Sequence, residues 1–99
     1  MLFGMVPISF DQRLTLAPEV SISDLHGELV LLNFETETYY GLDRVGAQIV
    51  NVLKEEPTIE AGVQALAQQF DVTEQRLRDD VEKLIGELLE AKLVELTTG

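Results

Sequence analysis

The sequence contains no cysteine and only one histidine, His26. Without cysteine the chain can form no disulfide bond or thiolate metal site, and it has no thiol nucleophile for catalysis. A zinc site would lack ligands, and a lone histidine beside a glycine in a turn is usually a solvated surface residue. The sequence therefore predicts no catalytic residue, no metal site and no cofactor.

Basic residues are also scarce. Seven lysines and arginines stand against eighteen acidic residues, which gives a net charge of −11. A negative net charge of this size repels phosphate backbones and anionic lipid surfaces, so nucleic acid and membranes are poor partners. A neutral or basic partner suits the chain better. The alternative is that the acidity only keeps a small protein soluble.

Long hydrophobic runs are missing as well. The first six residues are apolar, but they are few, they lack a basic flank and Pro7 follows them. This segment fits neither a signal peptide nor a membrane span, so a cytoplasmic location is expected. The length of 99 residues and the hydrophobic share of 45% predict one globular domain with a modest core of its own.

The first half of the chain shows the alternation of strands. Residues 1–18 alternate only loosely and are expected to form an N-terminal arm or a short strand, while 19–97 form a single domain. Strands are predicted over 20–25, 28–34 and 38–42, joined by tight turns. Four consecutive apolar residues place the second strand in the middle of the sheet. Such a meander leaves strand 38–42 at an edge.

The second half has helical periodicity and three N-cap signals. Asp43, Thr58 and Thr73 each precede a helical pattern, and Pro57 ends the first helix. The third helix, 73–91, carries the widest apolar stripe: Leu77, Val81, Leu84, Ile85, Leu88 and Leu89. The fold class is therefore α+β, a three-stranded antiparallel sheet followed by three helices. This order also fits a winged helix-turn-helix unit. Residues 93–96 are expected to end the chain as an extended segment or a last helical turn.

The most informative stretch runs over residues 38–45, where an edge strand passes almost directly into a helix. The free N–H and C=O groups of an edge strand can bind an incoming peptide as an added strand. Tyr39 and Tyr40 point to opposite sides of the sheet, so one can pack inward while the other lines a binding surface. The competing interpretation is that the tyrosines and the third-helix stripe only complete the core.

Two other function classes compete with peptide recognition. A winged helix-turn-helix protein would read DNA with its third helix, but this helix holds three basic residues against six acidic ones. The other is a structural interaction module with no peptide ligand. Adjacent carboxylates such as Asp79 and Asp80 point in different directions on a helix, so an enzyme is the class least favoured by the sequence.

Particular residues resemble a known family. They are Tyr39, Tyr40, Gly41, Leu42 and Asp43, then Gly46, Ala47 and Ile49, and finally Asp80, Val81, Leu84, Leu88, Leu93 and Val94. This pattern resembles the PqqD-like family, the precursor peptide recognition element of ribosomally made, modified peptides. It is most similar to the stand-alone version in lasso peptide biosynthesis. The resemblance spans residues 20–96. Asp43 stands where the family often has Asn, and both residues cap helices well.

The resemblance implies a non-catalytic protein that holds the leader of a precursor peptide against the third strand, beside the third helix. A leader-cleaving cysteine protease would be the partner enzyme, a separate cyclase would close the ring, and a monomer is expected. A PqqD-type chaperone for a radical enzyme is the alternative within the family. The implied leader contacts are Thr38, Tyr39, Tyr40, Gly41, Leu42, Arg78, Asp79, Val81, Leu84, Ile85 and Leu88.

Overall fold

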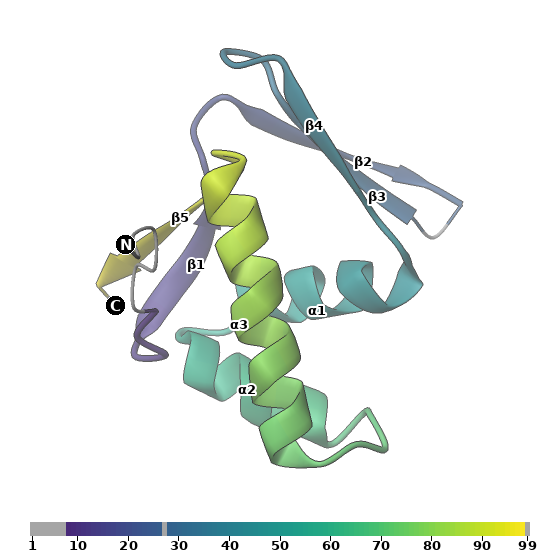
Figure 1. The fold of residues 1–99 in the computed structure, drawn as a ribbon, viewed down its shortest axis with the longest axis vertical. Coiled ribbons are helices and arrows are strands. Elements are labelled where there is room, and N and C mark those ends of the chain that lie inside the picture. The colour runs from purple at the N-terminus through teal and green to yellow at the C-terminus, as the bar shows by residue number, and fades with distance from the viewer. Residues whose placement is uncertain (1–7, 27, 99) are drawn as a thin grey trace, which may run out of the picture.

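The computed structural model describes residues 8–26 and 28–98, so the apolar N-terminal segment and Gly27 of the predicted turn lie outside the described residues. The described part holds five strands and three helices (Figure 1). In chain order these are β1 (Gln12–Leu16), β2 (Val20–Leu25), β3 (Glu28–Asn33), β4 (Thr38–Leu42), α1 (Arg44–Glu55), α2 (Ile59–Ala67), α3 (Glu74–Glu90) and β5 (Val94–Thr98). The α+β class is confirmed.

The three predicted strands form an antiparallel sheet with the order β2-β3-β4. Strand β3 lies in the middle, as its apolar run predicted, and β4 lies at an edge. Leu31 of β3 stands opposite Ile22 of β2 and opposite Tyr40 of β4. Because side chains alternate along a strand, this register defines which residues share each face of the sheet.

The predicted arrangement of one sheet followed by three helices was wrong in one respect. A second, two-stranded antiparallel sheet pairs β1 with β5, so a strand also follows the helices. Gln12 stands opposite Thr98, and Leu16 stands opposite Val94. The alternative of a last helical turn over 93–96 is excluded, because residues 94–98 are extended. Figure 1 shows this sheet on the side of the molecule away from the β2–β3 hairpin.

Each helix begins where its cap residue predicted. The side chains of Asp43, Thr58 and Thr73 accept hydrogen bonds from the backbone N–H groups of Gly46, Ala61 and Arg76. These bonds satisfy donors in the first turn that have no partner within the helix. Local chemistry therefore sets where every helix begins.

The core lies between the sheets and the helices, and its buried side chains come from all of these layers. Asn33 is its one buried polar residue among those that the structure describes, with 4% of its surface exposed. Its Nδ2 donates to the Lys92 carbonyl across 2.6 Å, and its Oδ1 accepts from the backbone N–H groups of Glu35 and Thr36. This side chain ties the end of β3 to the segment that leads into β5.

Candidate peptide-binding site

Strand β4 is held by β3 on one side and by α1 at its end. Asp43 joins β4 directly to α1, and its Oδ1 accepts a hydrogen bond from the Gly46 N–H across 2.8 Å. The strand order leaves the other side of β4 without a neighbouring strand in the described part of the chain. Backbone groups on that side are therefore available to a further strand.

The side chains of β4 alternate between two faces. Thr38, Tyr40 and Leu42 stand opposite Asn33, Leu31 and Leu29 of β3, all three of which are buried. They therefore belong to the inner face, which the helices cover. Leu42 is itself buried with 4% exposed. Tyr39 and Gly41 belong to the outer face and are exposed, so the prediction that the two tyrosines point to opposite sides is confirmed.

Tyr40 connects β4 to α3. Its hydroxyl donates a hydrogen bond to Glu87 Oε1 across 2.5 Å. This bond, partial burial and the nearby charges of Glu87 and Asp43 raise the pKa of Tyr40 above its ordinary value. The Tyr40 side chain therefore spans the space between the edge strand β4 and α3, and the Glu87 carboxylate lies where the two elements meet.

Glu87 was not among the residues predicted for this site. It is exposed and lies three residues after Leu84, hence on the same flank of α3. That spacing was the available signal, but no sequence pattern favoured Glu87 over the other acidic residues of the helix.

The predicted α3 contacts separate into two groups. Val81, Ile85 and Leu88 are 0% exposed and pack in the core. Leu84 is half-buried, and it lies one helical turn before Glu87. Among these four apolar residues, Leu84 is the one whose surface is open to a bound peptide.

Arg78 is occupied by contacts within the protein. Its guanidinium binds Glu60 of α2 and Glu74 one turn earlier on α3, and it lies 5.5 Å from the centre of the Phe10 ring. The pKa of the Glu60 carboxyl is lowered, chiefly by the hydrogen bond from Arg78. Arg78 therefore holds α3, α2 and the segment before β1 together. Asp79 is exposed and accepts a hydrogen bond from Gln75 on its own helix.

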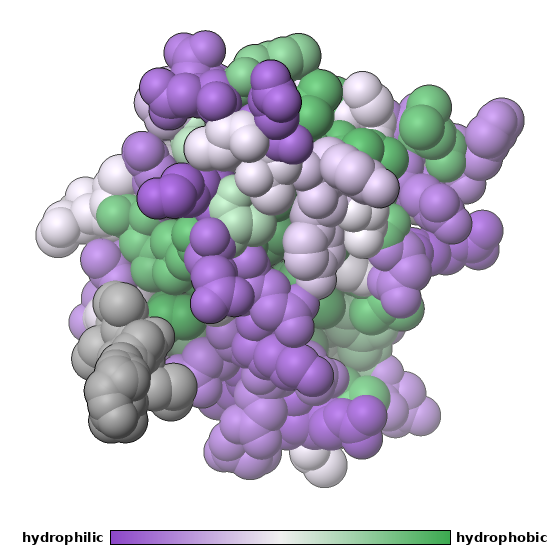
Figure 2. Space-filling view, turned by 45° about the horizontal axis from the view of Figure 1, so that its top comes forward, coloured by the Kyte–Doolittle hydropathy of each residue, from purple (hydrophilic) through white to green (hydrophobic). Residues whose placement is uncertain are grey.

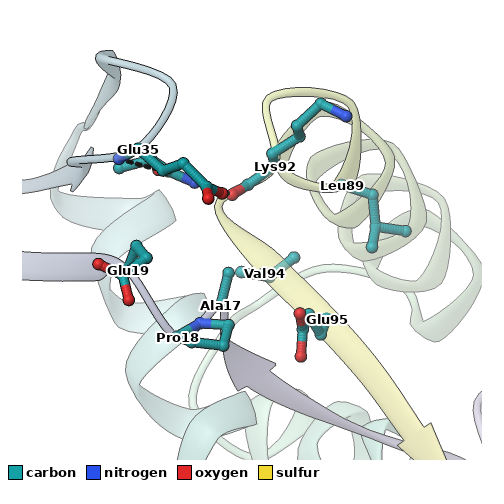
Figure 3. A pocket seen from close by; sticks show the side chains of 9 residues that line it. Ala17, Pro18, Glu19, Glu35, Leu89, Lys92, Val94 and Glu95 are labelled. Carbon is teal, nitrogen blue, oxygen red and sulfur yellow. Dashed lines mark hydrogen bonds between the residues drawn. The ribbon is translucent and has the colours of Figure 1, made fainter.

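A separate pocket of about 500 Å³ lies between the end of α3, β5 and residues 17–19 (Figure 3). It contains none of the predicted leader contacts. Three carboxylates and Lys92 contribute to its wall, together with the apolar side chains of Leu89 and Val94. Leu89 lies two residues after Glu87 and so points to a different flank of α3.

The part of the chain that the structure describes contains no group of three or more acidic or histidine side chains placed to hold a metal ion. None of the helices over the described residues combines the length and apolar character that a membrane crossing needs.

A sequence profile of the family described as "Coenzyme PQQ synthesis protein D (PqqD)" matches residues 28–94. This chain belongs to the PqqD family. The matched PqqD region begins at β3 and ends at the start of β5, so it includes β4 and α3 but neither β1 nor β2. A search of curated protein sequences gave no significant match.

Two solved structures share the PqqD fold of this chain. One is "TbiB1 in Complex with the TbiA(beta) Leader Peptide", with 30% identity, a TM-score of 0.75 and coverage of 81% of this chain and 93% of that chain. The other is "Lasso peptide synthetase B1 complexed with the leader peptide", with 24% identity, a TM-score of 0.76 and coverage of 84% and 98%. Both of these structures are complexes of a protein with a leader peptide. The resemblance to a PqqD-like recognition element is thereby confirmed.

Proposed function

We propose that this protein is a non-catalytic element that binds the leader of a ribosomally made precursor peptide in lasso peptide biosynthesis. The leader adds as a strand to the free edge of β4, beside α3. The bound precursor is then presented to a leader-removing cysteine protease. The protein acts as a monomer in the cytoplasm.

One observation carries this proposal: β4 is an edge strand whose inward tyrosine reaches α3. Backbone hydrogen bonds to β4 give affinity that depends little on the leader sequence, and side chains beside the strand select the leader residues. The relative named TbiB1, at 30% identity, is a leader-peptide complex, which supports the same ligand class here.

Strand β2 is the other edge of the three-stranded sheet, but two observations favour β4. The residues matched by the family include β4 but not β2, which supports β4 as the edge that binds the leader. The α3 helix also meets β4 through Glu87, where it can contribute side chains to the bound peptide.

The proposed contacts follow the exposure of each predicted residue. Thr38 to Leu42 provide the backbone edge, and Tyr40, Leu84 and Glu87 provide side chains beside it. Val81, Ile85 and Leu88 support the position of α3 from the core. Arg78 and Asp79 lie one to two turns before Leu84 and flank the site through their charges.

A winged helix-turn-helix regulator that reads DNA is the rival function, and the charge of α3 counts against it. Arg76 pairs with Asp80, and Arg78 pairs with Glu60 and Glu74. These pairs reduce the positive charge that α3 offers to DNA phosphates, which DNA binding requires. A PqqD-type role beside a radical enzyme would use the same edge with a different partner.

Hydrogen exchange with and without the leader tests strand addition. The probes are synthetic peptides that cover the leaders of candidate precursors, chosen from short reading frames in the neighbourhood of the gene. We expect binding to slow amide exchange in Thr38–Leu42, while Val20–Leu25 at the opposite edge is unchanged and serves as the control. Tight binding without any protection of β4, or protection of β2 instead, would exclude this mode.

A further inference from the structure

The pocket drawn in Figure 3 lies outside the predicted leader contacts, and four exposed charged residues line it: Glu19, Glu35, Lys92 and Glu95. They belong to the segment before β2, the turn after β3, the residues after α3, and β5. Segments that are far apart in the sequence therefore meet around one cavity of about 500 Å³, a volume typical of sites for small ligands. We call this cavity the end pocket, because it lies at the end of α3.

The carboxylates of the end pocket have no cationic partner among the residues that the structure describes. None of the ion pairs between those residues includes Glu19, Glu35 or Glu95. Lys92 is the one basic residue in the wall, and its side chain extends away from the labelled carboxylates in Figure 3. Three negative charges against one positive charge give the pocket an excess of negative charge that the described residues do not neutralise.

The rest of the wall is partly apolar and narrows the chemistry of the ligand. Ala17, Leu89 and Val94 line the pocket beside the carboxylates. Figure 2 turns forward the upper part of the molecule, where Figure 1 places the end of α3, and shows hydrophobic and hydrophilic surface side by side. An arginine side chain suits such a wall, because its aliphatic stem packs on apolar surface while its planar guanidinium donates hydrogen bonds to several carboxylate oxygens.

The end pocket lies at the Thr38 end of β4. Asn33, which lines the pocket, stands opposite Thr38 in the register of β3 with β4. Leu89, in another part of the wall, lies two residues after Glu87, which accepts the hydrogen bond from Tyr40 of β4. A peptide that pairs with β4 beside α3 and continues past Thr38 therefore leads toward this pocket.

We propose that the end pocket binds an arginine side chain of the precursor, from the part of its chain that continues past Thr38. The arginine adds a charged contact of its own to the backbone hydrogen bonds on β4. A precursor already held on β4 brings this side chain to the pocket at a high effective concentration, which a separate partner does not. This inference rests on the proposed function, because it takes the precursor as the source of the arginine.

The first test needs no precursor. The probe is N-acetyl-arginine amide, and its matched control is N-acetyl-citrulline amide, which has a similar shape but no charge. We expect the arginine compound to shift the backbone amide NMR signals of Glu19, Glu35, Leu89 and Glu95 in a saturable manner, and the citrulline compound to leave them unchanged. The variant Glu19→Gln/Glu35→Gln/Glu95→Gln should bind the arginine compound at least roughly fivefold more weakly, as the loss of partly exposed ion pairs allows.

A second variant controls for the net charge of the whole protein. Glu28→Gln/Glu55→Gln/Asp71→Asn removes the same number of negative charges from exposed residues that do not line the pocket. This control variant should bind the arginine compound as the wild type does, and circular dichroism checks that both variants fold. An equal loss in the two variants would show that only the overall charge matters.

The second test uses the candidate precursor peptides. In each peptide, citrulline replaces the arginines that lie outside the segment protecting β4 from hydrogen exchange. One such replacement should weaken binding to the wild type at least roughly fivefold at low salt and less at high salt. The same replacement should have little effect on the glutamine variant of the pocket, because the two changes remove the same contact.

The outcomes separate this inference from the proposed function. If no precursor binds while the arginine compound still shifts the pocket signals, the proposed function fails and the pocket remains a site for arginine from another source. A precursor that protects β4 but has no arginine outside the paired segment would overturn the inference. Citrulline peptides that bind as tightly as the arginine peptides would overturn it as well.

Discussion

The Tyr40 hydroxyl donates a hydrogen bond to Glu87 Oε1, and this contact joins the edge strand β4 to α3. A carboxylate that accepts the bond stabilises the neutral phenol, which raises the pKa of Tyr40 above its ordinary value of 10.0. The stabilisation from this pair is complete below about pH 10 and is lost as the pH rises through the raised pKa. A rise in pH above 10 therefore weakens the link between β4 and α3.

Glu87→Gln is expected to lower the pKa of Tyr40 toward its ordinary value, because it removes the charged acceptor. Titration of tyrosinate absorbance measures this directly, and Tyr40→Phe identifies which of the two tyrosines titrates late. The wild type should also lose more stability than Tyr40→Phe as the pH rises above 10. Identical titration curves for the wild type and Glu87→Gln would show that the bond is not formed in solution.

Leu84→Glu is expected to weaken leader binding by roughly tenfold or more, since a charge would replace an apolar contact. Leu89→Glu is the matched control, because Leu89 is also half-buried on α3 but points to the separate pocket. Fluorescence anisotropy of a labelled leader measures both affinities, and circular dichroism checks the fold. Equal losses in the two folded variants would show that the helix flank carrying Leu84 is not part of the site.

Ile85→Ala is expected to lower the free energy of unfolding by about 2–5 kcal/mol, as is usual for a large aliphatic residue lost from a packed core. Ile85 is 0% exposed, whereas its neighbour Leu84 is half-buried, so Leu84→Ala should cost less. Urea denaturation gives both values. A smaller cost at Ile85 than at Leu84 would contradict the orientation of α3. A charge placed at Ile85 should unfold the protein and cannot report on leader binding.

Asn33→Asp separates the two roles of this buried side chain. An aspartate oxygen can still accept from the Glu35 and Thr36 N–H groups, but it cannot donate to the Lys92 carbonyl. Leaving that carbonyl unpaired beside a buried charge should cost about 1–3 kcal/mol or more. Thermal unfolding at neutral pH measures the loss. Wild-type stability in Asn33→Asp would mean that the bond to Lys92 contributes nothing.

Local signals in the sequence were sufficient for the elements themselves. Asp43, Thr58 and Thr73 cap the helices that they predicted, because capping depends on residues three positions apart. The pairing of β1 with β5 joins two segments that lie about 80 residues apart in the sequence, residues 12–16 and 94–98. No local pattern encodes such a contact, so the second sheet could not be predicted and the final segment stayed ambiguous.

The sequence predicted which strand and which helix form the candidate site, but not which of their side chains are open to a ligand. Helical periodicity shows that Leu84 and Ile85 belong to one broad apolar stripe, yet neighbouring positions differ by about 100° around the helix. That difference buries Ile85 completely and leaves Leu84 partly open. Which part of an apolar stripe becomes buried depends on how other elements pack against the helix. The sequence of the helix alone does not determine that packing.

The pairing of β1 with β5 places residues near both ends of the chain side by side, since Gln12 stands opposite Thr98. In Figure 1 strands β1 and β5 lie side by side, away from the outer end of the β2–β3 hairpin. A tag, fluorophore or fused protein joined directly before Gln12 or directly after Thr98 would thus emerge from the same corner of the molecule. A short linker from Thr98 to Gln12 would therefore make this fold a suitable subject for circular permutation, with new ends opened in a surface turn.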